Sequence, residues 1–159
     1  MDVAHNKWWQ ISEVIFGIPL LAALVLQWIV PLSLPYGLLT TAVIFGSAVA
    51  LLGFIVIVLA RRELAKLGQP TDPGHPTSML VTTGIFSISR NPIYLGAVCF
   101  LAGIALAINL PWVLILLLPA LFACHYVLIA PEEKYLTAKF GEQYTRYAAS
   151  VHRWFGHIR

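Results

Sequence analysis

The sequence predicts an all-α integral membrane protein with about four transmembrane helices in two hairpins and an amphipathic helix near its carboxyl end. Apolar residues make up 59% of the 159 residues and charged residues only 11%, whereas soluble domains carry about 45–50% and about 25%. Two long stretches, 14–60 and 91–131, contain no Asp, Glu, Lys or Arg. This composition excludes a water-soluble monomer, a disordered chain and a nucleic-acid binder that depends on a basic surface.

Each charge-free stretch is long enough for two helices and a turn, because one transmembrane helix needs about 20 apolar residues. Prolines and other turn-forming residues divide the stretches, with Pro31 and Pro35 in the first and Asn109 and Pro111 in the second. We therefore expect a single membrane domain, 1–159, whose spans lie near 14–31, 37–60, 92–109 and 111–130. The third span is short.

The cations predict the orientation of these spans. Four spans place both termini and the loop between the hairpins on one side, and every Lys and Arg falls on that side. The positive-inside rule makes this the cytoplasmic face of a multi-pass protein. Tryptophans near the expected span ends, at 8, 9, 28, 112 and 154, fit the same picture. The ten cations are Lys7, Arg61, Arg62, Lys66, Arg90, Lys134, Lys139, Arg146, Arg153 and Arg159.

The two cysteines, Cys99 and Cys124, fall in separate spans and show no spacing typical of metal ligands. We expect them to be small buried apolar residues. A structural disulfide is the alternative. We predict no metal site.

Two polar segments, 61–91 and 131–159, can meet on the cytoplasmic side. Three prolines and three glycines in 68–84 predict a loop. Pro92 suits the first turn of the third span, with Asn91 or Ser89 as a possible cap. Arg90 then lies beside a helix amino terminus at the membrane boundary, where it could bind an anion or serve only as a positive-inside anchor.

The second polar segment begins with two adjacent carboxylates, Glu132 and Glu133. Neighbours on a helix point about 100° apart, so at most one of the two carboxylates can comfortably face water while the other faces into the protein. An inward carboxylate would need a hydroxyl, an ammonium or an arginine as its partner. An apolar stripe with helical spacing follows, bent near Gly141, and it could pack or stack on a ligand. Its members are Leu136, Phe140, Tyr144, Tyr147 and Val151.

His125 is the strongly polar, ionisable residue that falls well inside an expected span. Ionisable groups within the membrane are functional candidates by default. A neutral histidine hydrogen-bonded between helices is the alternative.

Residues 68–96, which end in Ser-Arg-Asn-Pro-Ile-Tyr-Leu-Gly, and residues 132–153, Glu-Glu-x-x-Leu-x-x-x-Phe-Gly-x-x-Tyr-x-x-Tyr-x-x-x-Val-x-Arg, resemble the two signatures of the isoprenylcysteine carboxyl methyltransferase family. Membrane relatives of that family include phospholipid N-methyltransferases. The resemblance implies an S-adenosylmethionine-dependent membrane methyltransferase that releases S-adenosylhomocysteine. It also implies a cofactor site at the cytoplasmic face and an acceptor that enters from the bilayer. The positions carried over are Arg90, Asn91, Pro92, Tyr94, Gly96, Glu132, Glu133, Leu136, Phe140, Gly141, Tyr144 and Tyr147.

The cofactor's groups suggest roles for these residues. Arg90 suits the methionine carboxylate, and Glu132 or Glu133 suits the ribose or the ammonium. Tyr94, Phe140 or Tyr144 could stack on adenine. Arg90, Glu132, Glu133 and His125 are the catalytic candidates. The sequence departs from the prenylcysteine enzymes at Asn91, where they usually have His, and at His152 and Gly156, where relatives often have proline.

The acceptor is expected to be a lipophilic small molecule or a lipidated substrate, with membrane lipids around it and no nucleic acid involved. The resemblance favours O-methylation of a carboxylate, which is ionised at neutral pH and needs no general base. An amine acceptor, as in phospholipid N-methylation, would have to lose a proton, and His125 or a glutamate could accept it. Two further alternatives are an NAD(P)H-dependent membrane reductase of the sterol-reductase type and a non-catalytic protein that acts by helix association.

Overall fold

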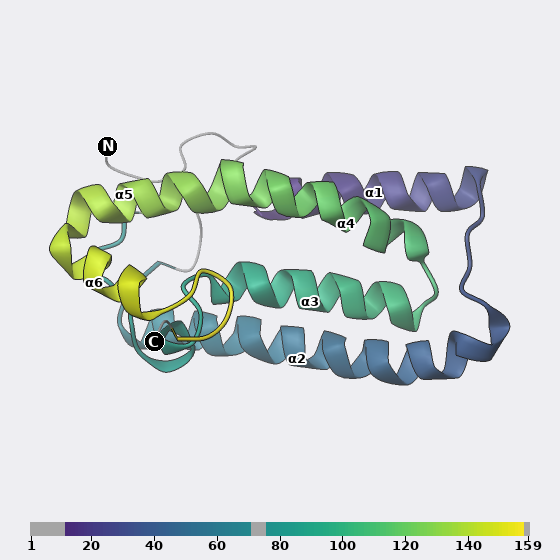
Figure 1. Ribbon diagram of the computed structural model, residues 1–159, viewed down its shortest axis with the longest axis horizontal. Coiled ribbons are helices and arrows are strands. Elements are labelled where there is room, and N and C mark those ends of the chain that lie inside the picture. The colour runs from purple at the N-terminus through teal and green to yellow at the C-terminus, as the bar shows by residue number, and fades with distance from the viewer. Residues whose placement is uncertain (1–11, 71–75, 158–159) are drawn as a thin grey trace.

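The computed structural model describes residues 12–70 and 76–157. Within these ranges the chain is helical, and four long apolar helices lie side by side along the longest axis of the molecule (Figure 1). Their bounds are α1 Ser12–Ile29, α2 Leu39–Lys66, α3 Pro92–Ala107 and α4 Pro111–Ala123. These bounds confirm the all-α class. Within the described residues, helix α2 packs chiefly against α3, and α1 packs against α4, so the two helices of the first expected hairpin are not paired with each other.

Three helical stretches are long and apolar enough to cross a membrane: Ser12–Ile29, Tyr36–Lys66 and Pro111–Phe140. The fourth, α3, has 16 residues, which at 1.5 Å per residue gives about 24 Å, less than the hydrocarbon thickness of a bilayer. The expectation of a short third span is therefore confirmed. The outward side chains of α2 are large and apolar, among them Ile44, Phe45 and Leu51, as a lipid-facing surface requires.

The orientation of the termini stays a prediction. Lys7, Trp8, Trp9 and Arg159 lie outside the described residues, as do residues 71–75 of the expected loop. The described part of that loop, 76–83, contains no α-helix, as the prolines and glycines predicted. Both cysteines are free thiols, so the structure contains no disulfide.

The second span was predicted to end at residue 60, and this boundary is wrong. Helix α2 continues to Lys66 because Arg, Glu, Ala, Leu and Lys are all good helix formers, and the appearance of charge does not stop a helix. The helix ends where Gly68 adopts a positive φ of 65°, which is typical of a glycine just past a helix end. Arg61, Arg62 and Lys66 are exposed on this extension.

The fourth span was expected near 111–130, and the helical stretch that contains it extends beyond residue 130. The chain stays helical from Pro111 to Phe140, through a π-helical segment, Cys124–Ile129, into α5, Ala130–Phe140. Pro131 lies just after the π-helical segment, inside this continuous helical stretch, and local π-type adjustments of the helical hydrogen bonds accommodate a proline there. One helix thus carries the fourth span and both glutamates into the polar end of the molecule.

Helices α2 and α3 make the closest helix contact in the fold, through glycines. A Cβ added to Gly103 would lie 2.3 Å from the Ala50 nitrogen, and one added to Gly53 would lie 2.5 Å from the Phe100 nitrogen. Real Cβ atoms do not approach so closely, so both backbones meet only because these positions lack a side chain. The small residues Gly46, Ala50, Gly103 and Ala107 form this contact.

At the opposite end from the termini, two polar side chains hold the turns together. Asn109 Oδ1 accepts a hydrogen bond of 2.8 Å from the Leu34 N–H. Trp112 Nε1 donates one of 2.8 Å to the carbonyl of Val30. The link between α1 and α2, which includes a short 3-10 turn at Tyr36–Leu38, is thereby fixed against the turn between α3 and α4.

The chain reverses at Gly141, whose φ is 53°, and continues as α6, Glu142–Ser150. The predicted bend near Gly141 is confirmed. The predicted apolar stripe also forms, as a packed cluster in which Leu80 of the loop joins it. The side chains of the stripe pack against one another and against Leu80. The members of this apolar cluster include Leu80, Leu136, Phe140, Tyr144, Tyr147 and Val151.

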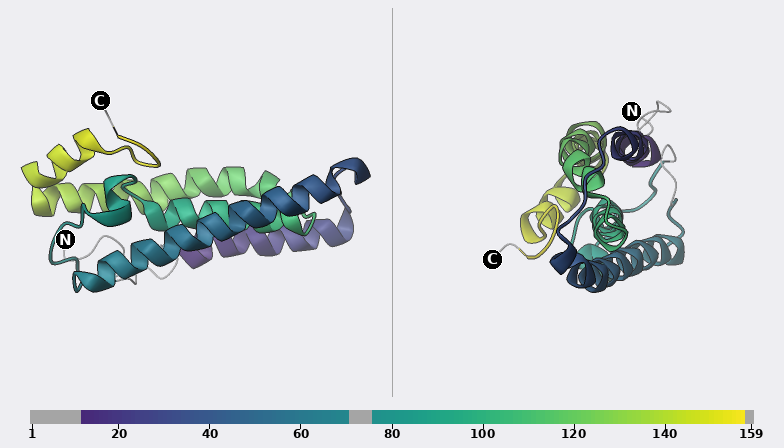
Figure 2. Two further views of the ribbon diagram at one scale, coloured as in Figure 1. Left: turned by 90° about the horizontal axis from the view of Figure 1, so that it is seen from below. Right: turned by 90° about the vertical axis from the view of Figure 1, so that its right-hand side faces the viewer.

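The segment after α6, residues 151–157, folds back beside residues 88–91. Val151 and His157 form an isolated antiparallel bridge. The Arg90 N–H donates to the carbonyl of His152 at 3.1 Å, and the Gly156 N–H donates to the carbonyl of Ile88 at 2.8 Å. Two views at right angles show α6 and this segment at one end of the bundle, against the amino end of α3 (Figure 2). We call residues 151–157 the C-terminal segment.

Candidate active site

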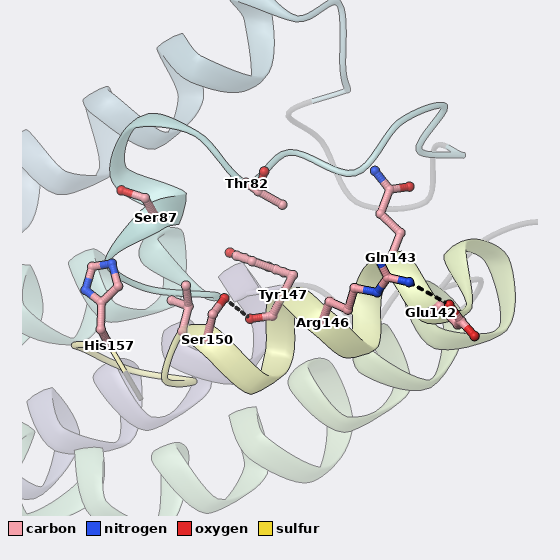
Figure 3. A pocket seen from close by; sticks show the side chains of 9 residues that line it. Thr82, Ser87, Glu142, Gln143, Arg146, Tyr147, Ser150 and His157 are labelled. Atoms are coloured by element: carbon pink, nitrogen blue, oxygen red, sulfur yellow. Dashed lines mark hydrogen bonds and ion pairs between the residues drawn. The ribbon is translucent and has the colours of Figure 1, made fainter. Parts of the chain in front are cut away.

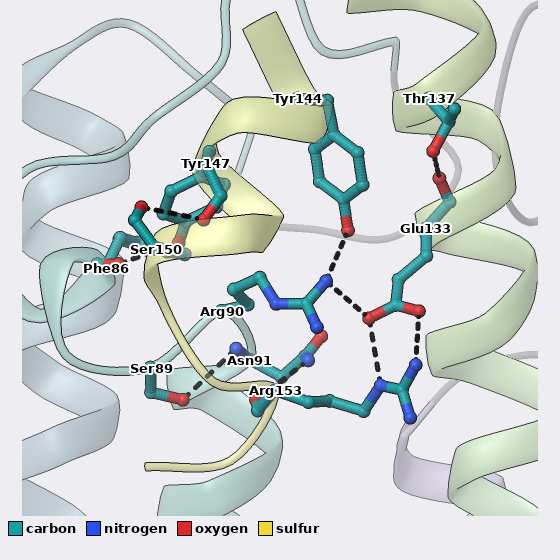
Figure 4. A network of polar contacts seen from close by, with 10 residues as sticks. All are labelled: Phe86, Ser89, Arg90, Asn91, Glu133, Thr137, Tyr144, Tyr147, Ser150 and Arg153. Carbon is teal, nitrogen blue, oxygen red and sulfur yellow. Dashed lines mark hydrogen bonds and ion pairs between the residues drawn. The ribbon is translucent and has the colours of Figure 1, made fainter. Parts of the chain in front are cut away.

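Arg90 and Glu133 form a largely buried ion pair at the polar end of the bundle (Figure 4). Arg90 Nη1 lies 3.0 Å from Glu133 Oε1, and the two side chains are 13% and 18% exposed. The same Nη1 donates a hydrogen bond of 3.3 Å to the hydroxyl of Tyr144 on α6. Two residues of the second polar segment, Glu133 and Tyr144, therefore converge on the guanidinium of Arg90 in the first.

A second arginine completes this group. Arg153 donates two hydrogen bonds to Glu133, from Nε to Oε1 at 2.9 Å and from Nη2 to Oε2 at 2.7 Å. This parallel two-bond geometry is the strongest arrangement for an arginine and a carboxylate. We call Arg90, Glu133, Tyr144 and Arg153 the Arg90 cluster. Sequence reasoning did not place Arg153 in the site, although it is the last residue of the second signature.

Ser89 and Asn91 hold the Arg90 backbone in place. Asn91 Nδ2 donates a hydrogen bond of 3.0 Å to the backbone carbonyl of Arg153, and the Ser89 hydroxyl accepts one of 3.2 Å from the Asn91 N–H. Both side chains are buried. Asn91 occupies the N-cap position of α3, but neither side chain caps the helix. The capping prediction is therefore wrong, because the Asn91 amide is engaged with the C-terminal segment instead.

Glu132 lies in a second polar pair with Tyr94 of α3, whose hydroxyl donates to Glu132 Oε2 at 3.2 Å. Tyr94 packs against the apolar cluster that includes Ile15 and Phe16 of α1. The expectation that at most one of the two glutamates faces water is met, since both are partly buried. Both are engaged because α5 is flanked on one side by α3 and on another by the Arg90 cluster, so directions 100° apart both meet protein.

The remaining predicted residues lie in different surroundings. Pro92 is buried as the first residue of α3, and Gly96 faces α2, where an added Cβ would lie 2.7 Å from Ile57 Cγ1. Leu136 and Phe140 pack in the apolar cluster of α5 and α6. Their predicted contacts with a cofactor stay predictions.

His125 lies in the π-helical segment, half-buried, with its ring edge-on to Tyr126 at a centroid distance of 4.8 Å. Among the described residues, it forms no hydrogen bond or ion pair with the Arg90 cluster. The structure therefore brings Arg90, Glu133 and Tyr144 together, with Glu132 and Tyr94 beside them, and does not add His125 to the group. Its catalytic role stays a prediction.

The tyrosines of α6 are held in their neutral form. Burial is the main cause that raises the pKa of Tyr144, with the negative charge of Glu133 adding to it. Burial also raises the pKa of Tyr147, whose hydroxyl donates to the carbonyl of Phe86 at 2.7 Å. The pKa of Arg153 is raised chiefly by its hydrogen bonds to Glu133. At neutral pH the cluster thus contains two cations, one carboxylate and two neutral phenols nearby.

These residues fit the amino-acid end of S-adenosylmethionine, which carries a carboxylate and an ammonium. The Nε atom of Arg90 is buried and has no hydrogen-bond partner among residues 12–70 and 76–157, so this guanidinium retains a donor for an additional acceptor. Arg90, Arg153 and Glu133 give the site separated positive and negative groups, and the Glu132 carboxyl lies beside them. Such a site suits a zwitterion.

A separate open groove of about 700 Å³ lies between α6 and residues 82–87 (Figure 3). Of the positions carried over from the family signatures, Tyr147 alone lines this groove. Tyr147 is shared with the apolar cluster, and its ring meets that of Tyr144 edge-on at 6.2 Å. The lining residues are Thr82, Ser87, Glu142, Gln143, Arg146, Tyr147, Ser150, Val151 and His157.

Comparison with protein families gives one match, to the model described as phospholipid methyltransferase, over residues 41–143. The matched region runs from α2 into α6 and includes Arg90, Tyr94, Glu132 and Glu133. Comparison with curated proteins gives no match. Comparison with solved structures gives none either. Because the family model covers well over half of the chain and contains the paired polar residues of the site, the chain belongs to the phospholipid methyltransferase family, a family of membrane methyltransferases.

Proposed function

We propose that this protein transfers a methyl group from S-adenosylmethionine to a lipophilic acceptor at the polar end of its helix bundle. The observation that carries the proposal is the Arg90 cluster, a buried set of opposite charges in a chain that is 11% charged. Buried charges are expensive and are retained where they bind or react. Helix packing alone does not need them, which argues against the non-catalytic alternative.

The residues have distinct roles in this proposal. Arg90, with its buried and unpartnered Nε, binds the carboxylate of the cofactor. Glu133 or Glu132 accepts hydrogen bonds from the cofactor's ammonium. When bound, S-adenosylmethionine supplies the electrophilic methyl group. The apolar cluster of α1, α3 and the π-helical segment keeps water from the Tyr94 side, where the lipophilic acceptor reaches the site from the bilayer.

The family fits either acceptor class. The signatures that 68–96 and 132–153 resemble favour a carboxylate, as in isoprenylcysteine O-methylation. The geometry at Glu132 favours an amine, as in phospholipid N-methylation, because within the described residues Glu132 has a phenol partner and no cation. A carboxylate beside the reacting atoms attracts an ammonium, can accept its proton and repels a second carboxylate. We therefore propose an amine as the methyl acceptor, with a carboxylate as the second candidate.

Binding tests the proposal directly. Purified full-length protein in detergent is titrated calorimetrically with S-adenosylhomocysteine, and with NADH and NADPH as controls for the reductase alternative. We expect saturable binding of S-adenosylhomocysteine alone. Arg90→Ala should weaken it by about tenfold or more, since a charged hydrogen bond contributes about 1.5–3 kcal/mol. Binding of a dinucleotide without S-adenosylhomocysteine would favour the reductase and contradict the proposal.

The acceptor class is tested by the chemistry of the product. Membranes containing the protein are incubated with methyl-labelled cofactor, and the lipid-soluble label is treated with mild alkali. A methyl ester releases labelled methanol, whereas an N-methyl group keeps its label. We expect alkali-stable label that is greatly reduced in Glu132→Gln and unchanged in Glu142→Gln, which alters an exposed glutamate of α6. Alkali-labile label would overturn the amine assignment and support the carboxylate.

A further inference from the structure

Arg153 is the one member of the Arg90 cluster that lies on the C-terminal segment, twenty residues beyond its partner Glu133. It is partly buried, with 37% of its side chain exposed, while Glu133 is 18% exposed. The family match ends at residue 143, so it does not include this arginine. Its contacts place it next to the proposed cofactor site.

Glu133 contacts two arginines in different ways. Arg153 engages both carboxylate oxygens, at 2.9 and 2.7 Å. Arg90 reaches only Oε1, with a single nitrogen, at 3.0 Å. Arg153 therefore engages both oxygens of Glu133 with its guanidinium, and the Nε of Arg90 has no hydrogen-bond partner within the described residues. Without Arg153, the Glu133 carboxylate could turn to meet Arg90 with both oxygens.

The backbone of the C-terminal segment is anchored to the residues around Arg90 independently of the Arg153 side chain. The Asn91 amide holds the Arg153 carbonyl at 3.0 Å, and the Arg90 N–H holds the His152 carbonyl at 3.1 Å. These bonds fix the position from which the Arg153 side chain extends to Glu133. The segment can thus stay in place when only the guanidinium is removed.

We infer that Arg153 is a positioning residue of the methyl-transfer site: by holding Glu133 with two hydrogen bonds, it keeps Arg90 available for the carboxylate of the cofactor. This inference rests on the proposed function. It assigns to Arg153 an effect that passes through Glu133 and not through direct contact with the ligand. Loss of Arg153 then lets Glu133 compete with the ligand for Arg90.

The test is a double-mutant cycle in cofactor binding. The affinity of S-adenosylhomocysteine is measured calorimetrically for the parent, Arg153→Ala, Arg153→Lys, Glu133→Gln and the double variant Arg153→Ala/Glu133→Gln. Arg146→Ala is the matched control, because Arg146 forms an exposed ion pair with Glu142. Thermal unfolding of every variant is recorded in the same detergent.

We expect Arg153→Ala to raise Kd about tenfold, because Glu133 would then compete with the ligand for Arg90. Lysine should restore part of the affinity, since it keeps the charge but not the two-bond geometry. In the Glu133→Gln background the same alanine change should raise Kd less than about twofold. Arg146→Ala should leave Kd unchanged.

Three results would overturn the inference. Arg153→Ala could bind as tightly as the parent. It could weaken binding equally in both backgrounds, which would mean that Arg153 contacts the ligand itself. It could also lose affinity only in proportion to a lowered unfolding temperature, with no rescue by lysine, which would mean a structural role. If the parent binds no S-adenosylhomocysteine, the proposed function fails first, and that result is distinct from these three.

Discussion

The hydroxyl of Tyr94 and the carboxylate of Glu132 meet at 3.2 Å across the interface between α3 and α5. They are 38 residues apart in the chain and come from the two separate signatures. Their contact joins the amino end of α3 to the end of the long helix that starts at Pro111, at a point flanked by apolar side chains of α1. The pair links the packing of the bundle to the chemistry of the site.

Tyr94→Phe is expected to lower the free energy of unfolding by about 1 kcal/mol, because the half-buried Glu132 loses its hydrogen-bond donor. The measurement is denaturant unfolding in detergent. Tyr126→Phe is the control, since Tyr126 is 69% exposed and forms no hydrogen bond among the described residues. Equal stability of the two variants would show that the Tyr94–Glu132 bond does not stabilise the fold.

Gly103→Ala is expected to destabilise the protein by about 1–3 kcal/mol, because the added methyl group has no room against the α2 backbone. Gly17→Ala on α1 makes the same change where no atom lies within 4 Å of the new Cβ. That control should be neutral or stabilising by up to about 1 kcal/mol, as alanine favours a helix more than glycine does. The measurement is the thermal unfolding temperature of both variants and the parent. An unchanged unfolding temperature for Gly103→Ala would contradict the close packing of α2 on α3.

Gly141→Ala is expected to cost about 1–3 kcal/mol, because φ is 53° at this position, where a side chain causes strain. The substitution should also weaken binding of S-adenosylhomocysteine, since α6 and Tyr144 follow directly from this residue. Gly37→Ala, in the 3-10 turn at the other end of the bundle, has space around it and no positive φ. It should change neither stability nor binding. Unaltered binding in a destabilised Gly141→Ala would show that α6 is not needed at the site.

Alkaline pH is expected to destabilise the fold through Tyr147. Burial raises its pKa, so the folded protein keeps the proton when the unfolded chain, with a pKa of about 10, has lost it. This contribution to stability is complete below about pH 10 and is lost as the pH rises above that value. Tyr147→Phe should therefore lose less stability than the parent between about pH 9 and pH 11. Tyr36→Phe, at an 89% exposed position, should follow the parent, and parallel curves for Tyr147→Phe and the parent would contradict the burial effect.

The sequence by itself determined the membrane class, the positions of the four apolar helices, the bend at Gly141 and the two motifs that form the site. These properties depend on local patterns: charge-free length, proline and glycine positions, and apolar residues repeated at helical spacing. The small residues of α2 and α3 also indicated close contact. Two helical stretches continue beyond their expected spans, to Lys66 and past Pro131, because a change of composition there does not change the backbone.

Only the tertiary structure decided how the polar side chains are paired. Glu132 and Glu133 both face protein because α5 lies between α3 and the C-terminal segment. The sequence of one helix does not predict which other elements pack around it. Arg153 donates hydrogen bonds to Glu133, and the Asn91 side chain, which was expected to cap α3, instead donates to the Arg153 carbonyl. These contacts connect residues 20 to 62 positions apart. They depend on the rotation and depth of whole helices, which packing fixes and sequence spacing does not.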